Sequence, residues 1–363
     1  MVQVSIIAAV AVLKTVDMTV GNLFFPTEYQ HNTQRVEFDY VEGGTSIALK
    51  GNFAKQSHIV PKSGFTTITV NPMQVNEAVT DSVINFNKKR IGETIYGAAA
   101  PSAISEAQRL VIENEIMRYG LLKNRKEVLL KKSFYDVLTT GQIVVSGVGD
   151  DVDTIDYVLP NKVVNDNSTA GQYQWNDKTN SFPVEQLESY SLGLGMFKFD
   201  TVILGAEARK AWTANPNVRT VDNTTTGKRK NFNPATPADK ASKSGTFMEY
   251  LGQTSGDTGP SIDVYAETET YTDTNGTQNY IDKNYVVCGA AGSLENGQVQ
   301  YGAIPVAQGS GEGVDIVAFV GKEWIDGEIK KDPAGVIRYY RSSPLPTMNK
   351  PKAFASLKVT LIA

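Results

Sequence analysis

The segment between Pro101 and Gly141 constrains this chain more than any other part of the sequence. Its side chains repeat at intervals of three and four residues, the spacing that places them on one face of an α-helix. Ser102 is a favourable N-cap residue, and Gly141 stands where helices commonly end in a left-handed glycine. We therefore predict one helix over 103–140, about 55 Å long at 1.5 Å per residue. The repeating face consists of Ala103, Ala107, Leu110, Asn114, Met117, Leu121, Asn124, Val128, Lys131, Tyr135 and Leu138.

Polar residues interrupt this face, which bears on what the helix packs against. Asn114, Asn124 and Lys131 stand at positions that an uninterrupted coiled coil would give to apolar side chains. We therefore expect a helix that lies across a sheet, with a coiled coil as the alternative. The opposite, charged face carries Glu106, Arg109, Glu113, Arg118, Lys123, Lys126 and Glu127.

An extended hairpin is predicted ahead of the helix, over 34–72. Its first strand alternates polar and apolar residues strictly, so Val36, Phe38 and Tyr40 would face a core or a partner. Its return strand is predicted at 65–70, after a polar stretch with too few apolar residues to fold alone. Such a hairpin leaves its edges unpaired and therefore needs a partner elsewhere.

The remaining sequence predicts an N-terminal arm over 1–33 and a second, mixed domain after a polar boundary at 161–182. Residues 217–260 are polar and turn-rich, with a short helix expected near 247–251. The Asn275-Gly276 step is typical of a hairpin turn, and a Pro-rich stretch separates the last two strands. The other predicted elements are strands at 142–146, 201–204, 285–288, 316–320, 336–341 and 354–362 and helices at 184–194 and 206–214.

The composition includes few of the residues that commonly act in catalysis or bind metals. The chain has one cysteine, Cys288, in an apolar strand typical of an inert core thiol, and two histidines, His31 and His58. Glycine-rich stretches at 147–149, 193–195 and 309–313 lack the lysine or the following helix of a phosphate-binding loop, and the acidic turn at 150–156 lacks the glycine and glutamate of a calcium loop. We predict no enzyme activity, no cofactor and no metal.

Charge and hydropathy limit the partners and the cellular location that we expect for this chain. The net charge of −4 is not that of a dedicated nucleic-acid binder. The apolar run at 4–13 is shorter than the roughly 20 residues of a membrane span. No basic residue precedes it, so it does not match a signal peptide. We expect a cytoplasmic protein without a membrane segment, and its unsupported arm, hairpin and long helix indicate that it assembles with copies of itself.

The order of these segments resembles the major capsid proteins of tailed bacteriophages, in the branch of the phage lambda major head protein E. The resemblance extends over nearly the whole chain and depends on joint order more than on any dense motif. The segments that carry it are Asn22–Pro26 with Thr33–Val36, Val60–Pro72, Lys88–Ile91 followed by Glu106–Gly141, Phe199–Trp212, and Arg341–Ser356.

The resemblance implies an α+β fold of the Hong Kong 97 type, shared with herpesvirus floor proteins, and a capsid subunit that assembles through pentamers and hexamers around double-stranded DNA. It implies scaffold and portal partners, in this branch also a decoration protein, non-specific DNA contact, and assembly in the host bacterial cytoplasm. Its parts would be an N-terminal arm (1–33), an E-loop hairpin (34–72), a peripheral domain with the spine helix (73–182), an axial domain (183–335) and closing strands that return to the peripheral domain (336–363).

The subunit interface expected from these readings consists of Phe24, Phe25, Ile59, Val60, Lys62 and Phe65. Some relatives cross-link a lysine to an asparagine. Lys55 or Lys62 with Asn349 would be the pair here, but that chemistry is not expected in this branch. The alternatives are a phage tail tube or other virion component, which would be mostly β without the long helix, and a surface adhesin, which would carry a signal sequence.

Overall fold

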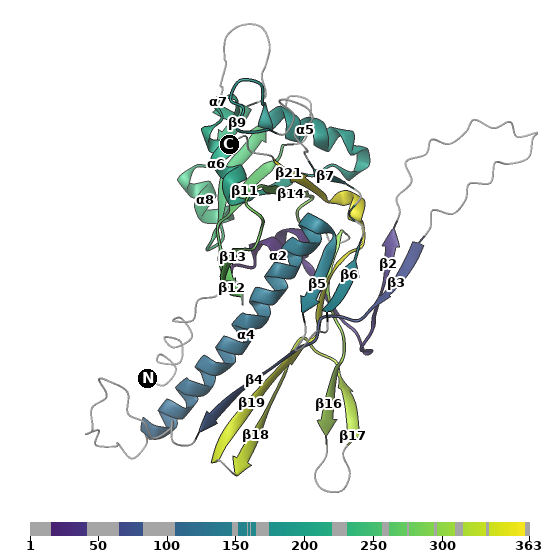
Figure 1. Ribbon diagram of the computed structural model, residues 1–363, viewed down its shortest axis with the longest axis vertical. Coiled ribbons are helices and arrows are strands. Elements are labelled where there is room, and N and C mark those ends of the chain that lie inside the picture. Colours follow the sequence, from purple (N-terminus) through teal and green to yellow (C-terminus); the bar gives the residue numbers. More distant parts are fainter. Residues whose placement is uncertain are drawn as a thin grey trace, which may run out of the picture.

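The computed structural model confirms an α+β protein built around one long helix (Figure 1). It describes residues 16–41, 65–82, 106–146, 152–157, 159, 161–164, 174–219, 231–255, 261–273, 276–293, 296–308, 315–331 and 334–359. The apolar run at 4–13 and the expected helix start at 103 lie outside these residues. No helix among them is long and apolar enough to cross a membrane.

The long helix, α4 (Glu106–Thr140), ends where the sequence predicts. Gly141 adopts φ +77°, and its N–H donates to the carbonyl of Val137 at 3.0 Å. A side chain would be unfavourable there, because a Cβ on Gly141 would lie 2.8 Å from the amide nitrogen of Leu159. The helix contacts strands of several sheets, so the expected packing across a sheet is confirmed in preference to a coiled coil.

A seven-stranded sheet forms one end of the molecule, with helices packed around it (Figure 1). Its strands run in the order β7 (Lys162–Val164), β21 (Ala355–Lys358), β14 (Tyr285–Gly289), β8 (Thr201–Leu204), β11 (Asp263–Glu267), β10 (Met248–Ser255) and β9 (Asn231–Pro234). Strand β8 is buried throughout and apolar at three of its four residues, which suits a central strand covered on both faces. The Trp175 ring packs nearby against Trp212 at a tilted angle, with 5.4 Å between ring centroids. The helices are α5 (Pro183–Gly193), α6 (Ala206–Ala214), α7 (Pro216–Arg219) and α8 (Pro237–Lys243), with the short 3-10 turns η1 (Gly195–Phe197) and η2 (Pro351–Ala353).

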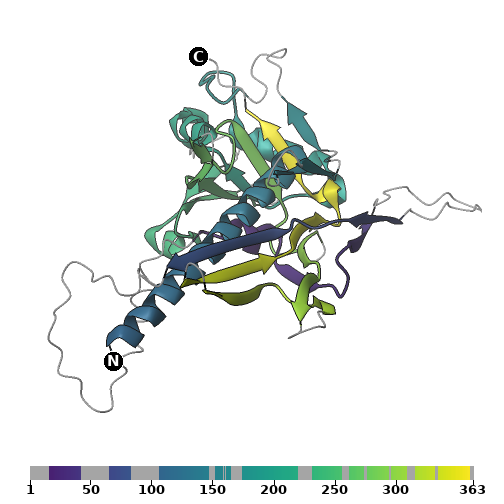
Figure 2. The same ribbon diagram turned by 60° about the horizontal axis from the view of Figure 1, so that its bottom comes forward.

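A second sheet runs beside α4, as Figure 2 shows. It consists of β18 (Trp324–Lys331), β19 (Ala334–Ser342) and β4 (Val75–Ser82), all antiparallel. Val75 and Tyr340 of this sheet pack with Leu122 of the helix.

The described part of the N-terminal arm, residues 16–33, packs with the core instead of lying apart from it. Helix α2 (Thr19–Phe24) contacts α4, and β1 (Thr27–Gln30) pairs in parallel with β15 (Gly297–Tyr301). The third strand of this sheet, β20 (Pro344–Met348), is buried throughout and is antiparallel to β15. Its prolines are tolerated because β20 is the edge strand of this described sheet, where one side needs no ladder hydrogen bonds.

Four two-stranded ribbons complete the described fold. They are β2 (Val36–Val41) with β3 (Phe65–Val70), β5 (Gln142–Ser146) with β6 (Val152–Asp156), β12 (Thr270–Asp273) with β13 (Gly276–Asn279), and β16 (Ile304–Gln308) with β17 (Asp315–Phe319). The first and third confirm the predicted hairpins, and Gly276, a residue of the predicted turn, begins β13 with φ +105°.

Several local predictions were wrong. Residues 248–251 of the expected short helix at 247–251 belong instead to strand β10, because their partner β11 lies beside them in the sheet. The expected loop at 161–182 contains β7, and the Pro-rich stretch contains β20. Three strands also lie across the expected domain boundaries, since β18 shares a sheet with β19 and β4, and β7 and β21 belong to the seven-stranded sheet. These pairings join distant segments, which local patterns do not specify.

Candidate assembly surfaces

The β2–β3 hairpin projects from the body while its base is anchored in the core (Figures 1 and 2). Its register pairs Val36 with Val70 at the base and Val41 with Phe65 at the outer end. Val36 and Phe38 are buried as the alternation predicts, and the Phe38 ring contacts the Tyr157 ring at 5.9 Å. The hairpin is thus held at one end and extends away from its own subunit at the other.

The predicted interface residues have different outcomes. Phe24 and Phe25 are 1% and 3% exposed, because the Phe25 ring stacks on Phe134 of α4 at 4.6 Å and both phenylalanine rings contact Phe354. Their assignment to the subunit interface is therefore corrected to a role in the core of their own chain. Ile59, Val60 and Lys62 lie outside the described residues, as does the side chain of Phe65, whose backbone pairs in β3.

Exposed large apolar side chains concentrate at the end of the molecule opposite the seven-stranded sheet. Of those exposed in the described chain, five lie within residues 316–329, on β17, β18 and the short connection between them. They are Ile316, Val317, Val320, Ile325 and Ile329. The sequence predicted a strand at 316–320 but not its exposure, because a continuous apolar run is typical of a strand buried on both faces. This contrast marks β17 and β18 as candidates for burial by another chain.

A buried charge cluster joins α4 to the end of strand β11 and to the segment that follows it. The Nζ atom of Lys131 lies 2.9 Å from Oε2 of Glu267 and 2.7 Å from Oε2 of Glu269, and all three side chains are almost fully buried. The hydroxyl of Tyr135, one helical turn on, donates to Oε2 of Glu267 at 2.8 Å. Burial, followed by the nearby Glu267 carboxylate, raises the pKa of Tyr135. Lys131, the polar residue that interrupts the apolar face of the helix, therefore forms buried ion pairs.

The same cluster reaches the N-terminal arm. The backbone N–H of Asp17 donates to Oε2 of Glu269 at 3.3 Å, and the Asp17 carboxylate accepts hydrogen bonds from the N–H groups of Phe247 and Met248 at 2.7 and 2.9 Å. Burial alone would raise the pKa of Asp17, but hydrogen bonds to Thr19 and these two amides outweigh it and lower that pKa. Arm, helix and sheet are thus connected through charged groups rather than through apolar packing alone.

A second polar cluster holds α4 against β18 and β19. The Glu323 carboxylate accepts from the hydroxyls of Tyr119 and Tyr340 at 2.9 and 2.8 Å. Lys126, expected on the solvent face, is buried beside this cluster. Burial lowers its pKa, although Glu323 opposes that effect.

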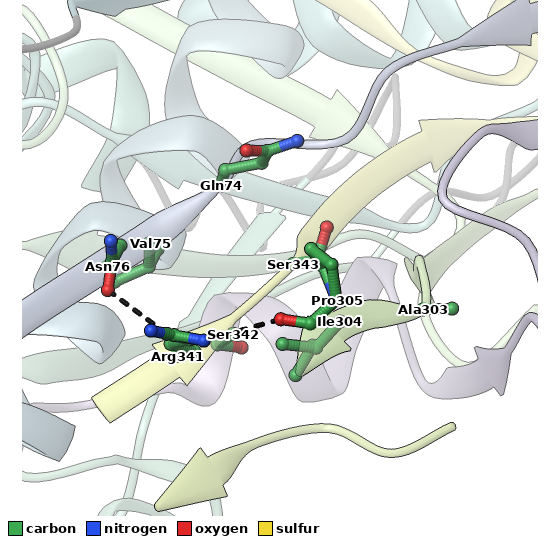
Figure 3. Close-up of a pocket in the computed structure, with 9 residues that line it drawn as sticks. All are labelled: Gln74, Val75, Asn76, Ala303, Ile304, Pro305, Arg341, Ser342 and Ser343. Atoms are coloured by element: carbon green, nitrogen blue, oxygen red, sulfur yellow. Dashed lines mark hydrogen bonds between the residues drawn. The ribbon is translucent and has the colours of Figure 1, made fainter. Parts of the chain in front are cut away.

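A small pocket of about 120 Å³ lies where β4, β16 and β19 meet (Figure 3). Arg341 lines it, and its guanidinium donates to Oδ1 of Asn76 and to the carbonyl of Pro305, both at 3.3 Å. These bonds attach the β16–β17 ribbon to the sheet beside α4. The pocket therefore lies at a contact between two structural elements of the subunit. No group of three or more metal-binding side chains occurs in the described parts of the chain.

Cys288 is fully buried in β14, and burial raises the pKa of its thiol. Since the thiolate is the reactive form, we expect Cys288 to react with a thiol reagent at least roughly 10³-fold more slowly in the native subunit than in urea, the ratio that an opening free energy of about 4 kcal/mol gives. Timed labelling in the two conditions measures this ratio. Comparable rates would contradict the buried placement.

Comparisons with known proteins show which solved structures the chain resembles. The solved structure of a protein assigned as the capsid protein of an Escherichia coli CFT073 prophage superposes with a TM-score of 0.64, at 16% identity and 98% coverage of both chains. A phage-related protein of Bordetella bronchiseptica RB50 is also similar, with a TM-score of 0.46, 12% identity, and coverage of 98% of this chain and 95% of that one. A chain of Mycobacterium phage Patience gives a TM-score of 0.46 at 11% identity, covering 99% and 87%. No curated protein matches in sequence.

The long helix beside its sheet, the projecting hairpin and the full-length superposition on the prophage structure show a fold of the Hong Kong 97 type. The sequence profile of phage major capsid protein E matches residues 3–359, and the chain belongs to that family. It is a family of structural proteins of the virion capsid and not a family of enzymes.

Proposed function

We propose that copies of this chain assemble through pentamers and hexamers into the icosahedral head that encloses phage double-stranded DNA. The observation that carries the proposal is the β2–β3 hairpin, which projects beyond its own subunit in a chain of the major capsid protein E family. A two-stranded ribbon of this kind gains stability when a neighbouring subunit covers it. Ile59, Val60, Lys62 and Phe65 are the residues proposed to reach that neighbour.

The proposed parts of the subunit follow the expected division. They are an arm (1–33), an E-loop (34–72), a peripheral domain around α4 (73–182), an axial domain around the seven-stranded sheet (183–335) and closing strands (336–363). In this division β18 contributes to the peripheral sheet and β21 to the axial sheet.

The proposed partners are other copies of the chain, scaffold and portal proteins, a decoration protein, and packaged DNA. The net charge of −4 suits a shell whose contact with DNA is non-specific, because the packaged DNA is already neutralised by counterions and a basic inner surface would bind it tightly. Assembly is proposed to take place in the host bacterial cytoplasm.

Deleting residues 51–64, the polar part of the hairpin, is expected to abolish shells while leaving the subunit folded. The reason is that the sequence of this segment is polar with few apolar residues, and the described core is formed by other residues. Negative-stain electron microscopy and light scattering measure assembly, and circular dichroism measures folding. Intact shells from the folded deletion variant would contradict the proposed role of the hairpin.

The same microscopy of the unaltered protein, expressed alone, separates the capsid from the tail-tube alternative. Shells or capsomer-sized rings support the head protein, whereas tubes of stacked rings would favour the tail component. The 35-residue helix α4 already argues against a mostly β tail protein.

A further inference from the structure

Strand β18 is an edge strand whose pairing with β19 is regular along its whole length. In the described chain it is paired only with β19, through eight consecutive residue pairs without a bulge. A long regular edge presents a row of unpaired backbone donors and acceptors, which is a template for pairing with another chain. Natural edges are commonly protected by bulges, prolines or charged side chains; β18 has no bulge and no proline, and its charged residues include both signs.

One face of β18 continues an apolar surface that is buried elsewhere in the subunit. Ile325 is paired with Tyr340 of β19, which α4 covers, and therefore lies on the same face of the sheet. Ile325 and Ile329 are nevertheless 48% and 80% exposed. Helix α4 contacts β4 and β19, so the apolar face extends beyond the helix at β18.

The charges that flank Ile329 indicate which chain covers this edge. Glu328 precedes it and Lys330 follows it. When two β18 strands run antiparallel about Ile329, position 328 of each copy stands opposite position 330 of the other. A carboxylate then faces an amino group twice, and isoleucine faces isoleucine between them. Oppositely charged cross-strand pairs stabilise a sheet, whereas a different partner would have to supply this alternation by itself.

We propose that β18 pairs with β18 of a second copy, in an antiparallel and two-fold symmetric contact centred on Ile329. The contact joins two three-stranded sheets into one sheet of six strands and covers Ile329 of both copies. This proposal rests on the proposed function, because it names one surface through which the capsid subunit meets its neighbours. It is separate from the projecting hairpin.

A cysteine at position 329 tests the symmetry directly. Residues directly opposite in an antiparallel pair have Cβ atoms about 4.5–5.5 Å apart, close to the range a disulfide bridges. The only native cysteine, Cys288, is buried, so the unaltered protein provides a silent background. The Ile329→Cys variant, purified as the full chain and treated with a mild oxidant, is expected to form disulfide-linked dimers on a non-reducing gel, both in shells and in soluble subunits.

Ile325→Cys is the matched control, since it lies on the same strand and face and is also exposed. In the proposed register two copies of position 325 are separated by about 26 Å along the strands, at roughly 3.3 Å per residue, and do not cross-link. Linkage at 329 that exceeds linkage at 325 at least ten-fold supports the proposal. Equal linkage, or none at 329, overturns it.

Charge exchange gives an independent readout. Glu328→Lys and Lys330→Glu, made singly, are each expected to weaken association roughly ten-fold, since both symmetric pairs become repulsive. The two changes together restore it. Failure of the double variant to recover would overturn the self-pairing. Shells that form without any linkage at 329 would contradict this contact but not the proposed function, and linked dimers without shells would contradict the proposed function alone.

Discussion

Replacing Lys131 by methionine is expected to lower the free energy of unfolding by about 3–5 kcal/mol, although the change keeps a long side chain in the helix. The variant leaves Glu267 and Glu269 buried without their counter-charge, since the Lys131 ammonium contacts both carboxylates. A buried carboxylate that loses its partner bears the full cost of desolvation. Chemical denaturation of unassembled subunits measures the loss.

Arg125→Met is the control for this prediction. Arg125 lies on the same helix as Lys131 and pairs with Glu77 of β4, but its side chain is 63% exposed. Exposed pairs contribute about 0–1 kcal/mol, so this variant should unfold almost as the unaltered protein does. Adding Glu267→Gln and Glu269→Gln to Lys131→Met is expected to recover part of the stability, because the unpaired charges are removed. Equal effects of Lys131→Met and Arg125→Met would show that the cluster does not stabilise the subunit.

Phe25→Ala is the second change with a large expected effect, again about 3–5 kcal/mol of unfolding free energy. The ring is stacked between Phe134 of α4 and Phe354 before β21, so its removal leaves a cavity where arm, helix and closing segment meet. Denaturation of isolated subunits measures the effect, and Tyr29→Ala, at a half-exposed position of the same arm, is expected to change stability by less than about 0.5 kcal/mol.

The Phe25 experiment also distinguishes the two roles considered for this residue. A core residue lowers the stability of the isolated subunit, whereas an interface residue would leave that stability unchanged and weaken assembly. Unaltered unfolding of the Phe25→Ala subunit, together with fewer shells, would restore the assignment to the interface.

The elements with strong local patterns were predictable from the sequence. Helix α4 has a continuous three- and four-residue repeat and a terminal glycine, and β2 has a strict alternation. Strand β10 was missed because a short helix was expected there, and β20 because its segment is rich in proline; only distant partners make them strands.

The candidate surfaces were less predictable than the fold. Phenylalanines such as Phe24 and Phe25 are common both in subunit interfaces and in cores, and no local pattern in the sequence distinguishes these two roles. Ile329 lies among charged residues and gave no signal until its edge position was known. The polar residue Lys131, noted as an interruption of the helical face, was the one local sign of the buried cluster.

By itself, the sequence determined the long helix and its end and the hairpins, because periodicity and turn residues act over short distances along the chain. The class of protein followed from the resemblance in segment order over nearly the whole chain. Only the tertiary structure decided which apolar side chains the subunit covers itself and which it leaves exposed for another chain. That outcome depends on which strands become neighbours, and strand pairing joins residues far apart in sequence. Phe25 and Ile329 are both apolar, but one has Phe134 and Phe354 against it and the other has no covering element in the described chain.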